Sequence, residues 1–343
     1  MSRKVAEIAK HAYRAVGLPL LGMLGGFALL RRIRRDSALV LMYHSVIDTC
    51  GDRGLLTNVN QVDTGSFRWQ VWFLKNHYEV VRLSTIVERI RNRKPVTGLA
   101  AITFDDGYLS VFESAAPILH AYNLPATVFL IAGLVDKDEM TWYDKVEAHL
   151  LNTSVSKITI GAEDYHLDGE RETAIRAVKH RLGDVDLEAR ERLVAELVGQ
   201  AGELEHAARK RYRLMGWREV ERLREQGFDF GVHSYSHPHL TKVPSRSLQL
   251  EIDASAKLIS DRLHVPIETL VFCYPHGDYD DRVRDRVIAT GMLGAMGVKH
   301  DLTPPDGDPF ALPRVGVSRD QTRAMFMEAT VGLSAWLKRR IPT

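Results

Sequence analysis

Cysteine is scarce in this chain of 343 residues, which contains only Cys50 and Cys273. Two distant cysteines lack the paired spacing of a structural zinc site and cannot build a disulfide framework. The chain also lacks a dinucleotide-binding glycine fingerprint, a phosphate-binding P-loop and an internal repeat. These absences exclude small disulfide-rich scaffolds and solenoids, and they leave an ordinary globular protein for which we expect no nucleic-acid partner.

A long apolar run is also missing, because the run at residues 16–30 has only 15 residues. As a helix it would reach roughly 22 Å, short of the roughly 30 Å hydrocarbon core of a membrane. Residues 1–36 hold eight Lys and Arg against two Asp and Glu, although the whole chain has a net charge of only +2. A cleaved signal peptide fits poorly, since the basic sequence RRIRR at 31–35 follows the run.

We therefore expect residues 1–36 to form a segment that anchors the protein on one leaflet of an anionic membrane. Basic residues on both flanks favour the cytoplasmic face. The alternative is a tail that packs on the rest of a soluble cytoplasmic protein.

Strand and helix patterns alternate over residues 37–320. Apolar strand patterns occur at residues 38–43, 79–83, 99–104, 126–131, 228–233, 269–274 and 293–298. Helical patterns lie between them, at residues 66–76, 84–92, 110–122, 216–226, 245–263 and 280–290, with Ser66, Ser84 and Ser245 as expected N-caps. This alternation predicts an α/β fold with parallel strands, in which chemical groups collect at the carboxyl ends of the strands.

The pattern changes between about residues 135 and 215, where we expect a helical insertion beside the mouth of the site. Residues 170–182 and 186–213 are charged and helix-prone, with apolar residues three or four apart. Residues 321–343 end the chain, and an amphipathic helix is predicted at 321–340.

Two adjacent carboxylates, Asp105 and Asp106, follow the strand pattern at 99–104 and precede Gly107. Like charges side by side at a strand end are costly unless a cation balances them. A divalent metal ion is the obvious candidate, although an isolated pair of this kind more often caps a turn or a helix.

His233 and His237, four residues apart, supply further ligands. On a helix this spacing puts both imidazoles on one face, and in a loop after a strand it can also bring them together. One carboxylate and two imidazoles leave a coordination position open, which is typical of a catalytic metal. Isolated histidines also occur in caps and cores, but both motifs here lie where a strand meets its loop.

These motifs, TFDDGY at 103–108 and HSYSH at 233–237, resemble those of the NodB-type polysaccharide deacetylases, carbohydrate esterase family four. The resemblance covers residues 38–319 around the insertion and implies a distorted (β/α)7 barrel. It also implies that Asp106, His233 and His237 hold a divalent metal and that Asp105 is the general base. Zinc is preferred, and cobalt, nickel or manganese would suit the same ligands.

The third family motif, usually Arg-x-Pro-Tyr, is replaced here by Cys273, Tyr274, Pro275 and His276. The backbone N–H of His276 could still serve the oxyanion, but the arginine that would accompany the base is missing. Arg314 offers a replacement, because the LPR segment at 312–314 resembles one with which a subset of the family orients its base.

His44 is the expected general acid. The MYH segment at 42–44 resembles one in the poly-N-acetylglucosamine deacetylase branch, where the order of the motifs is permuted. A histidine has the pKa near neutrality that protonation of a leaving amine requires. Without this context, a histidine that caps the first strand would be the preferred interpretation.

The resemblance implies a metal-dependent hydrolase that removes N-acetyl groups from an amino sugar in a polysaccharide or a lipid-linked saccharide. Trp142 opens the insertion and could stack on sugar rings or fasten the insertion to the barrel. Further substrate contacts are expected from Tyr274, Pro275 and His276. The same site could instead remove a formyl group or open a cyclic amide, and a catalytically dead saccharide-binding protein is the alternative outside the enzymes.

Overall fold

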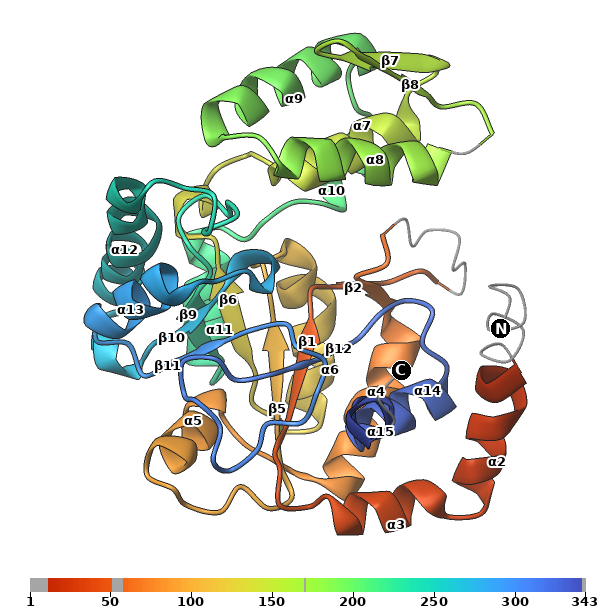
Figure 1. Ribbon diagram of the computed structural model, residues 1–343, viewed down its shortest axis with the longest axis vertical. Coiled ribbons are helices and arrows are strands. Elements are labelled where there is room, and N and C mark those ends of the chain that lie inside the picture. Colours follow the sequence, from red (N-terminus) through yellow and green to blue (C-terminus); the bar gives the residue numbers. More distant parts are fainter. Residues whose placement is uncertain (1–11, 51–57, 170, 341–343) are drawn as a thin grey trace.

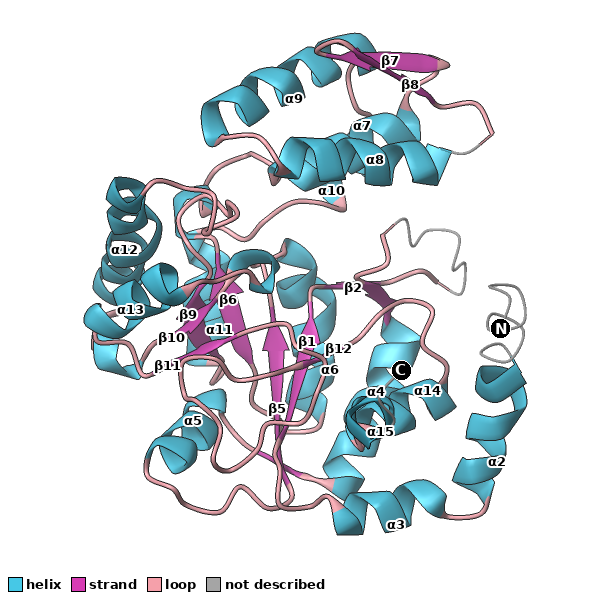
Figure 2. Ribbon diagram, in the orientation of Figure 1, coloured by secondary structure: helices cyan, strands magenta, loops and turns pink. Residues whose placement is uncertain are grey.

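The computed structural model describes residues 12–50, 58–169 and 171–340, and its centre is a curled parallel sheet (Figures 1 and 2). Seven strands follow one another in the order β11-β10-β9-β6-β5-β1-β12, and an eighth, β4, pairs with the first residues of β5. The strands are β1 (Leu39–Tyr43), β4 (Glu79–Val80), β5 (Leu99–Phe104), β6 (Thr127–Leu130), β9 (Asp229–Val232), β10 (Val271–Cys273), β11 (Gly294–Met296) and β12 (Val315–Gly316).

The two ends of this strand path meet at Leu312. Its N–H donates to the carbonyl of Ala295, and the N–H of Gly297 donates to the carbonyl of Leu312. This parallel bridge joins β11 to the chain before β12, which confirms the expected distorted barrel with seven ring strands. The membership of the ring differs from the expectation, because β4 lies outside it and β12 completes it. Two residues are too few to show a strand period in the sequence.

Helices occur at each place outside the sheet where the sequence predicts them. They are α4 (Thr64–His77), α5 (Leu83–Arg91), α6 (Ala116–Ala121), α11 (Trp217–Glu225), α12 (Ser255–Leu263) and α13 (Asp281–Ala289). The predicted serine caps are wrong. Asp63 accepts from the N–H of Ser66 at 2.9 Å and caps α4, while the turns at Ser84 and Ser245 begin without a side-chain cap.

The barrel strands are buried on both faces, which explains their continuous apolar sequences. Along β5, Ile102 and Phe104 belong to the large core between strands and helices, whereas Ala101 belongs to a second cluster with the interior residues of neighbouring strands. Because side chains alternate along a strand, Thr103 and Asp105 follow Ala101 on the inner face. The predicted site therefore begins where this inner face reaches the carboxyl end of the barrel.

The insertion lies over the carboxyl ends of the strands, as the green segment in Figure 1 shows. It has a core of its own and is tied to the barrel by hydrogen bonds between residues 107–109 and 213–215. The predicted second helix is wrong in length, because Gly202, with φ of 85°, ends it early, and the antiparallel pair β7-β8 was not expected. Its elements are α7 (Trp142–Asn152), β7 (Lys157–Ile160), β8 (Glu163–His166), α8 (Arg171–Gly183), α9 (Leu187–Ala201) and α10 (His206–Lys210).

The two ends of the described chain pack on each other. Leu18 of α2 (Leu18–Met23) and Phe27 of α3 (Gly26–Ile33) contact an apolar cluster on α14 (Arg323–Thr330) and α15 (Leu333–Arg340). The single C-terminal helix predicted at 321–340 is wrong, because Gly332 has φ of 59° and separates α14 from α15. In the part of the chain that the structure describes, no single helix is long and apolar enough to cross a membrane, whereas the bent pair Tyr13–Met23 and Gly26–Ile33 could by length and composition.

A small parallel pair completes the described strands. It consists of β2 (Ser45–Ile47), directly after β1, and β3 (Gln61–Asp63), directly before α4. The pair lies beside the site-bearing end of β1 and holds the chain after His44 close to the barrel.

Candidate metal centre and catalytic cleft

A cavity of about 940 Å³ lies at the carboxyl ends of the barrel strands, beneath helix α8 of the insertion. It collects residues that are up to 278 positions apart in the sequence, because successive parallel strands end at the same edge of the barrel. The predicted residues that line it are His44, Asp105, Asp106, Trp142, His233, His237, Tyr274 and His276.

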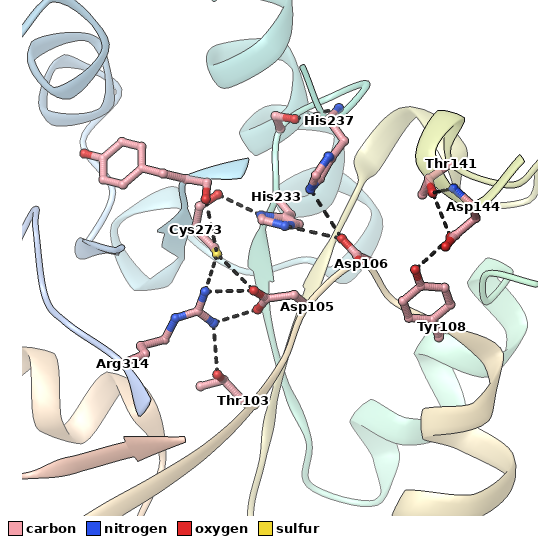
Figure 3. A network of polar contacts seen from close by, with 12 residues as sticks. Thr103, Asp105, Asp106, Tyr108, Thr141, Asp144, His233, His237, Cys273 and Arg314 are labelled. Atoms are coloured by element: carbon pink, nitrogen blue, oxygen red, sulfur yellow. Dashed lines mark hydrogen bonds and ion pairs between the residues drawn. The ribbon is translucent and has the colours of Figure 1, made fainter. Parts of the chain in front are cut away.

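Asp106, His233 and His237 bring one carboxylate oxygen and two imidazole nitrogens together (Figure 3). Oδ1 of Asp106 lies 3.4 Å from Nε2 of His233 and 3.5 Å from Nε2 of His237. This oxygen is buried and accepts no hydrogen bond from the described residues. Donor atoms about 2.1 Å from one tetrahedral ion lie roughly 3.4 Å apart, so the three residues fit a divalent metal ion.

A backbone carbonyl fixes the ring of His233. Its Nδ1 lies 2.8 Å from the carbonyl oxygen of Cys273. Because a carbonyl only accepts, Nδ1 carries the proton and Nε2 keeps its lone pair for a metal. The backbone of His237 is held by Ser234, whose Oγ accepts from the His237 N–H at 2.9 Å.

A buried carboxylate also fixes the loop between the two histidines. Glu251 accepts hydrogen bonds from the N–H groups of Tyr235 and Ser236 at 3.0 and 2.9 Å, and from the Ser236 hydroxyl at 2.7 Å. The sequence gives no sign of this role, because Glu251 lies within an ordinary helical pattern, 16 positions after Tyr235.

Three site residues, Asp106, His237 and His276, have positive φ angles of 68°, 58° and 57°. This region costs a residue with a side chain on the order of 1–3 kcal/mol. Gly107 is also in it, and a Cβ at this position would lie 2.8 Å from the side chain of Leu130. These backbone conformations place the side chains at the cavity, and hydrogen bonds such as that from the His237 N–H to Ser234 stabilise them.

Arg314 and Asp105 form a buried bidentate pair. Nη1 donates to Oδ1 at 2.6 Å, and Nη2 donates to Oδ2 at 2.8 Å. Burial alone would raise the pKa of Asp105, but the Arg314 guanidinium holds it well below its usual range. Asp105 is therefore ionised at neutral pH. It lies outside the group formed by Asp106, His233 and His237, although it forms a second group of possible ligand atoms with His233 and Cys273.

Cys273 makes room for this arginine. Arg314 is fully buried, and its remaining donors reach the carbonyl of Gly297 at 3.1 Å, the hydroxyl of Thr103 at 3.1 Å and the sulfur of Cys273 at 3.0 Å (Figure 3). The larger arginine of the common third motif would occupy the position of Cys273. The guanidinium therefore reaches Asp105 from the chain before β12 instead of from the chain after β10.

His44, Tyr274, Pro275 and His276 all lie at the carboxyl ends of β1 or β10. His44 faces the cavity and its Nδ1 is buried without a hydrogen-bond partner in the described part of the chain. The hydroxyl of Tyr274 donates to the carbonyl of Phe310 at 2.9 Å, and Pro275 is buried. Burial, together with His239 and His233, lowers the pKa of His276 to about 3.

A second polar network ties the metal-binding loop to the insertion (Figure 3). The hydroxyls of Tyr108 and Thr141 each donate to Oδ2 of Asp144 at 2.7 Å. Burial raises the pKa of Asp144 to about 7, because these hydrogen bonds offset only part of the desolvation. The ring of Tyr143, beside it, lies 5.0 Å from that of His237.

Asp144 is absent from the predicted site, although its sequence context carries a usable signal. Thr141 and Asp144 have the T-x-x-D spacing of a capping box, and the Thr141 Oγ accepts from the Asp144 N–H at 3.2 Å. The motif marks the start of α7, but only the tertiary fold brings it against Tyr108.

The chain also matches a known protein family. The family model for polysaccharide deacetylases matches residues 92–295, more than half of the chain. The chain belongs to the polysaccharide deacetylase family. The buried carboxylate and two histidines are thus the candidate metal site of a polysaccharide deacetylase fold.

The most informative curated relative is the poly-beta-1,6-N-acetyl-D-glucosamine N-deacetylase of Escherichia coli K12. It is 34% identical over 98 residues, a match that covers 28% of this chain and only 14% of the relative. The match therefore spans a small part of that longer protein.

Two solved structures extend the likeness over most of the chain. The Streptococcus pyogenes deacetylase PplD has a TM-score of 0.58 at 14% identity, covering 86% of this chain and 98% of its own. IcaB from Ammonifex degensii has a TM-score of 0.55 at 17% identity, covering 88% of this chain and 97% of its own. At these identities the likeness concerns the fold alone.

Proposed function

We propose that the protein is a metal-dependent hydrolase that removes N-acetyl groups from an amino sugar in a saccharide chain or a lipid-linked saccharide. The observation that carries this proposal is the pairing of two adjacent carboxylates with different partners. Asp106 faces two histidine nitrogens at 3.4 and 3.5 Å, while Asp105 is held by Arg314 at 2.6 and 2.8 Å. One carboxylate is free to bind a metal while the other remains an ionised base.

An N-acetyl amide resists hydrolysis because its carbonyl is a weak electrophile and an amine is a poor leaving group. A divalent ion held by Asp106, His233 and His237 would polarise the carbonyl and make water more acidic. Asp105, fixed by Arg314, accepts the proton of the attacking water.

Two further groups complete the proposed chemistry. The N–H of His276 donates to no other backbone group in the described part of the chain and is available to the substrate oxygen. We assign the general acid to His44, because a pKa of about 3 keeps the His276 ring neutral, whereas protonation of a leaving amine calls for an imidazolium. Trp142, Tyr274 and Pro275 stay proposed substrate contacts around this centre.

Acetate release from N-acetylglucosamine oligomers tests the proposal. We expect Asp105→Asn to lose about 10²–10⁴-fold in kcat while keeping its metal, and His233→Ala to lose the metal as well. Full activity in either variant would refute the mechanism. Mass analysis of the products separates acetate from formate or a ring-opened amide.

Metal analysis distinguishes an enzyme from a saccharide-binding protein. We expect a chelator to remove activity and zinc to restore it, with cobalt, nickel and manganese as the alternatives to compare. Purified protein that takes up none of these ions, yet still binds N-acetylglucosamine oligomers, would support the binding role.

We also propose that the N-terminal segment rests on an anionic membrane, at the cytoplasmic face, where lipid-linked saccharides are accessible. The face of α2 and α3 that does not pack on α14 carries exposed apolar side chains, including Met23 at 84% and Leu24 at 77% exposure. Exposed Arg32 and Arg35 lie in and after the last turn of α3. Apolar and basic groups together favour an anionic interface.

Vesicle co-sedimentation tests this second proposal. The full chain should sediment with phosphatidylglycerol-containing vesicles and less with pure phosphatidylcholine. The double variant Met23→Asp, Leu24→Asp should stay in the supernatant, whereas Ile288→Asp, which alters a distant exposed apolar residue on α13, should behave as the wild type. Equal sedimentation of both variants would contradict the membrane contact.

A further inference from the structure

Arg190, on helix α9 of the insertion, is a buried cation without a polar partner in the described part of the chain. Its exposed fraction is 2%, and its Nη2 is buried with no hydrogen bond. The guanidinium lies 5.0 Å from the centre of the Trp142 ring, and no described carboxylate lies within ion-pair distance of it. A buried charge left unpaired is strongly unfavourable, so this arrangement favours the binding of an anion.

Arg190 lines a second cavity of about 880 Å³, next to the catalytic one. The other cations on its wall already have carboxylate partners. Lys145 lies 3.5 Å from Glu139, and Arg209 lies 3.0 Å from Asp138. Arg190 is therefore the positive charge on the described wall of this cavity that remains available to a ligand.

Three carboxylates influence the pKa of Arg190 without contacting it. Burial lowers this pKa, and Glu191, Glu251 and Asp186 offset part of that effect. Glu251 is occupied by the loop that carries the metal-binding histidines, and Asp186 caps α9 by accepting from the Ala189 N–H at 2.8 Å. Glu191 is exposed and lines the same cavity as Arg190, without an ion pair to it.

Trp142 forms part of the wall of both cavities. Its Nε1 is a second buried donor without a partner in the described chain. On the catalytic side, the Trp142 ring lies 6.3 Å from the ring of His276, which lines the catalytic cavity. Trp142 thus lies over Arg190 and beside the lining of the catalytic cavity.

We propose that Arg190, stacked on Trp142, binds an oxyanion carried by the saccharide substrate, so that the enzyme prefers acidic over neutral sugar chains. A planar guanidinium binds a carboxylate or a phosphate through two hydrogen bonds, and desolvation strengthens this contact. The oxyanion belongs either to a uronic acid residue or to the phosphate of a lipid-linked sugar. The anion site itself is independent of the proposed function. Only the identification of its ligand as part of the substrate rests on that function.

Calorimetry with D-glucuronate and with inorganic phosphate tests the site independently of turnover. The matched variants are Arg190→Met, which keeps an apolar stem against Trp142, and Arg209→Met, which removes a paired cation from the same cavity. We expect Arg190→Met to weaken binding of at least one anion about tenfold or more, and Arg209→Met to change it less than about twofold. The anion that is lost identifies the source of the oxyanion.

Kinetics then places the site in the reaction. With an acidic N-acetylated oligosaccharide, Arg190→Met should raise KM about tenfold with little change in kcat, whereas a neutral oligomer should be unaffected. Unchanged binding of both anions in Arg190→Met would overturn the proposal, even if the enzyme is an active deacetylase. Equal losses in both variants would also overturn it.

A purely structural role for Arg190 makes a different prediction. If its only function were to hold Trp142, Arg190→Met would lower the melting temperature, and Arg190→Lys would bind anions as the wild type does. We expect instead that Arg190→Met melts at the same temperature or higher, since it removes an unpaired buried charge. Arg190→Lys keeps the charge without the planar fork, so it should bind more weakly than the wild type and provides the binding test if Arg190→Met does not fold.

Discussion

The barrel mouth and the helical insertion each bury an acid and an arginine, with opposite results. In the barrel, Asp105 and Arg314 contact each other, which lowers the pKa of the acid and raises that of the arginine against the effect of burial. In the insertion, Asp144 and Arg190 have no oppositely charged group in contact among the described residues. Burial raises the pKa of Asp144 to about 7 and lowers that of Arg190. Desolvation acts on all four groups, and the partner decides which charge state survives.

Removal of the ion pair between Arg314 and Asp105 should have the largest effect on stability and activity. Arg314→Ala leaves Asp105 buried without a cation, so we expect unfolding to become easier by about 3–5 kcal/mol. The pKa of Asp105 should rise, and because a base must be ionised, the acidic limb of the kcat/KM profile should move to higher pH. Urea unfolding and a pH–rate profile measure the two effects.

Arg284→Ala is the matched control for this variant. Arg284 also donates two hydrogen bonds to one aspartate, Asp308, at 2.9 and 2.7 Å, but that pair lies at the surface. Its loss should cost no more than about 1 kcal/mol. An acidic limb that does not move in Arg314→Ala would remove Arg314 from the mechanism.

Asp144→Asn should remove a pH dependence of stability that belongs to the insertion. The folded pKa of about 7 lies above the ordinary value of 3.8, so the folded state binds the proton more tightly and loses stability as the pH rises from about 4 to about 7. Asparagine resembles the protonated acid. We therefore expect the variant to gain roughly 2.5 kcal/mol on the wild type between pH 5 and pH 8.

Urea unfolding at these two pH values measures the difference. The exposed Asp285 on α13, changed to asparagine, is the control and should follow the wild type at both pH values. If Asp144→Asn also follows the wild type, the contrast between a paired and an unpaired buried acid fails.

His44→Ala should lower turnover and leave the stability of the fold almost unchanged. Removal of a general acid lowers kcat by about 10²-fold or more, and the metal content should not change because His44 is outside the cluster of ligands. His120→Ala, at an exposed position of α6, should keep full activity. Unchanged turnover in His44→Ala would mean that the leaving-group proton comes from elsewhere.

Local sequence was enough to predict the metal-binding residues. The pair Asp105-Asp106 and the histidines His233 and His237 stand directly after buried strands, and parallel strands bring such positions to one edge. The predicted cap at Ser245 and the predicted single helix at 321–340 were wrong for the opposite reason. Caps and breaks depend on one competing residue, such as Gly332, and not on the periodicity of a whole segment.

By itself, the sequence determined the alternation of strands and helices, the ligand types and their place at strand ends, because these follow from period and spacing. The tertiary structure alone decided which buried charges have partners. Arg314 meets Asp105 across 209 positions and Asp144 meets Tyr108 across 36. Arg190 lies over the face of Trp142 and has no polar partner among the described residues. Whether a charge is compensated depends on contacts between distant segments, which no local pattern encodes.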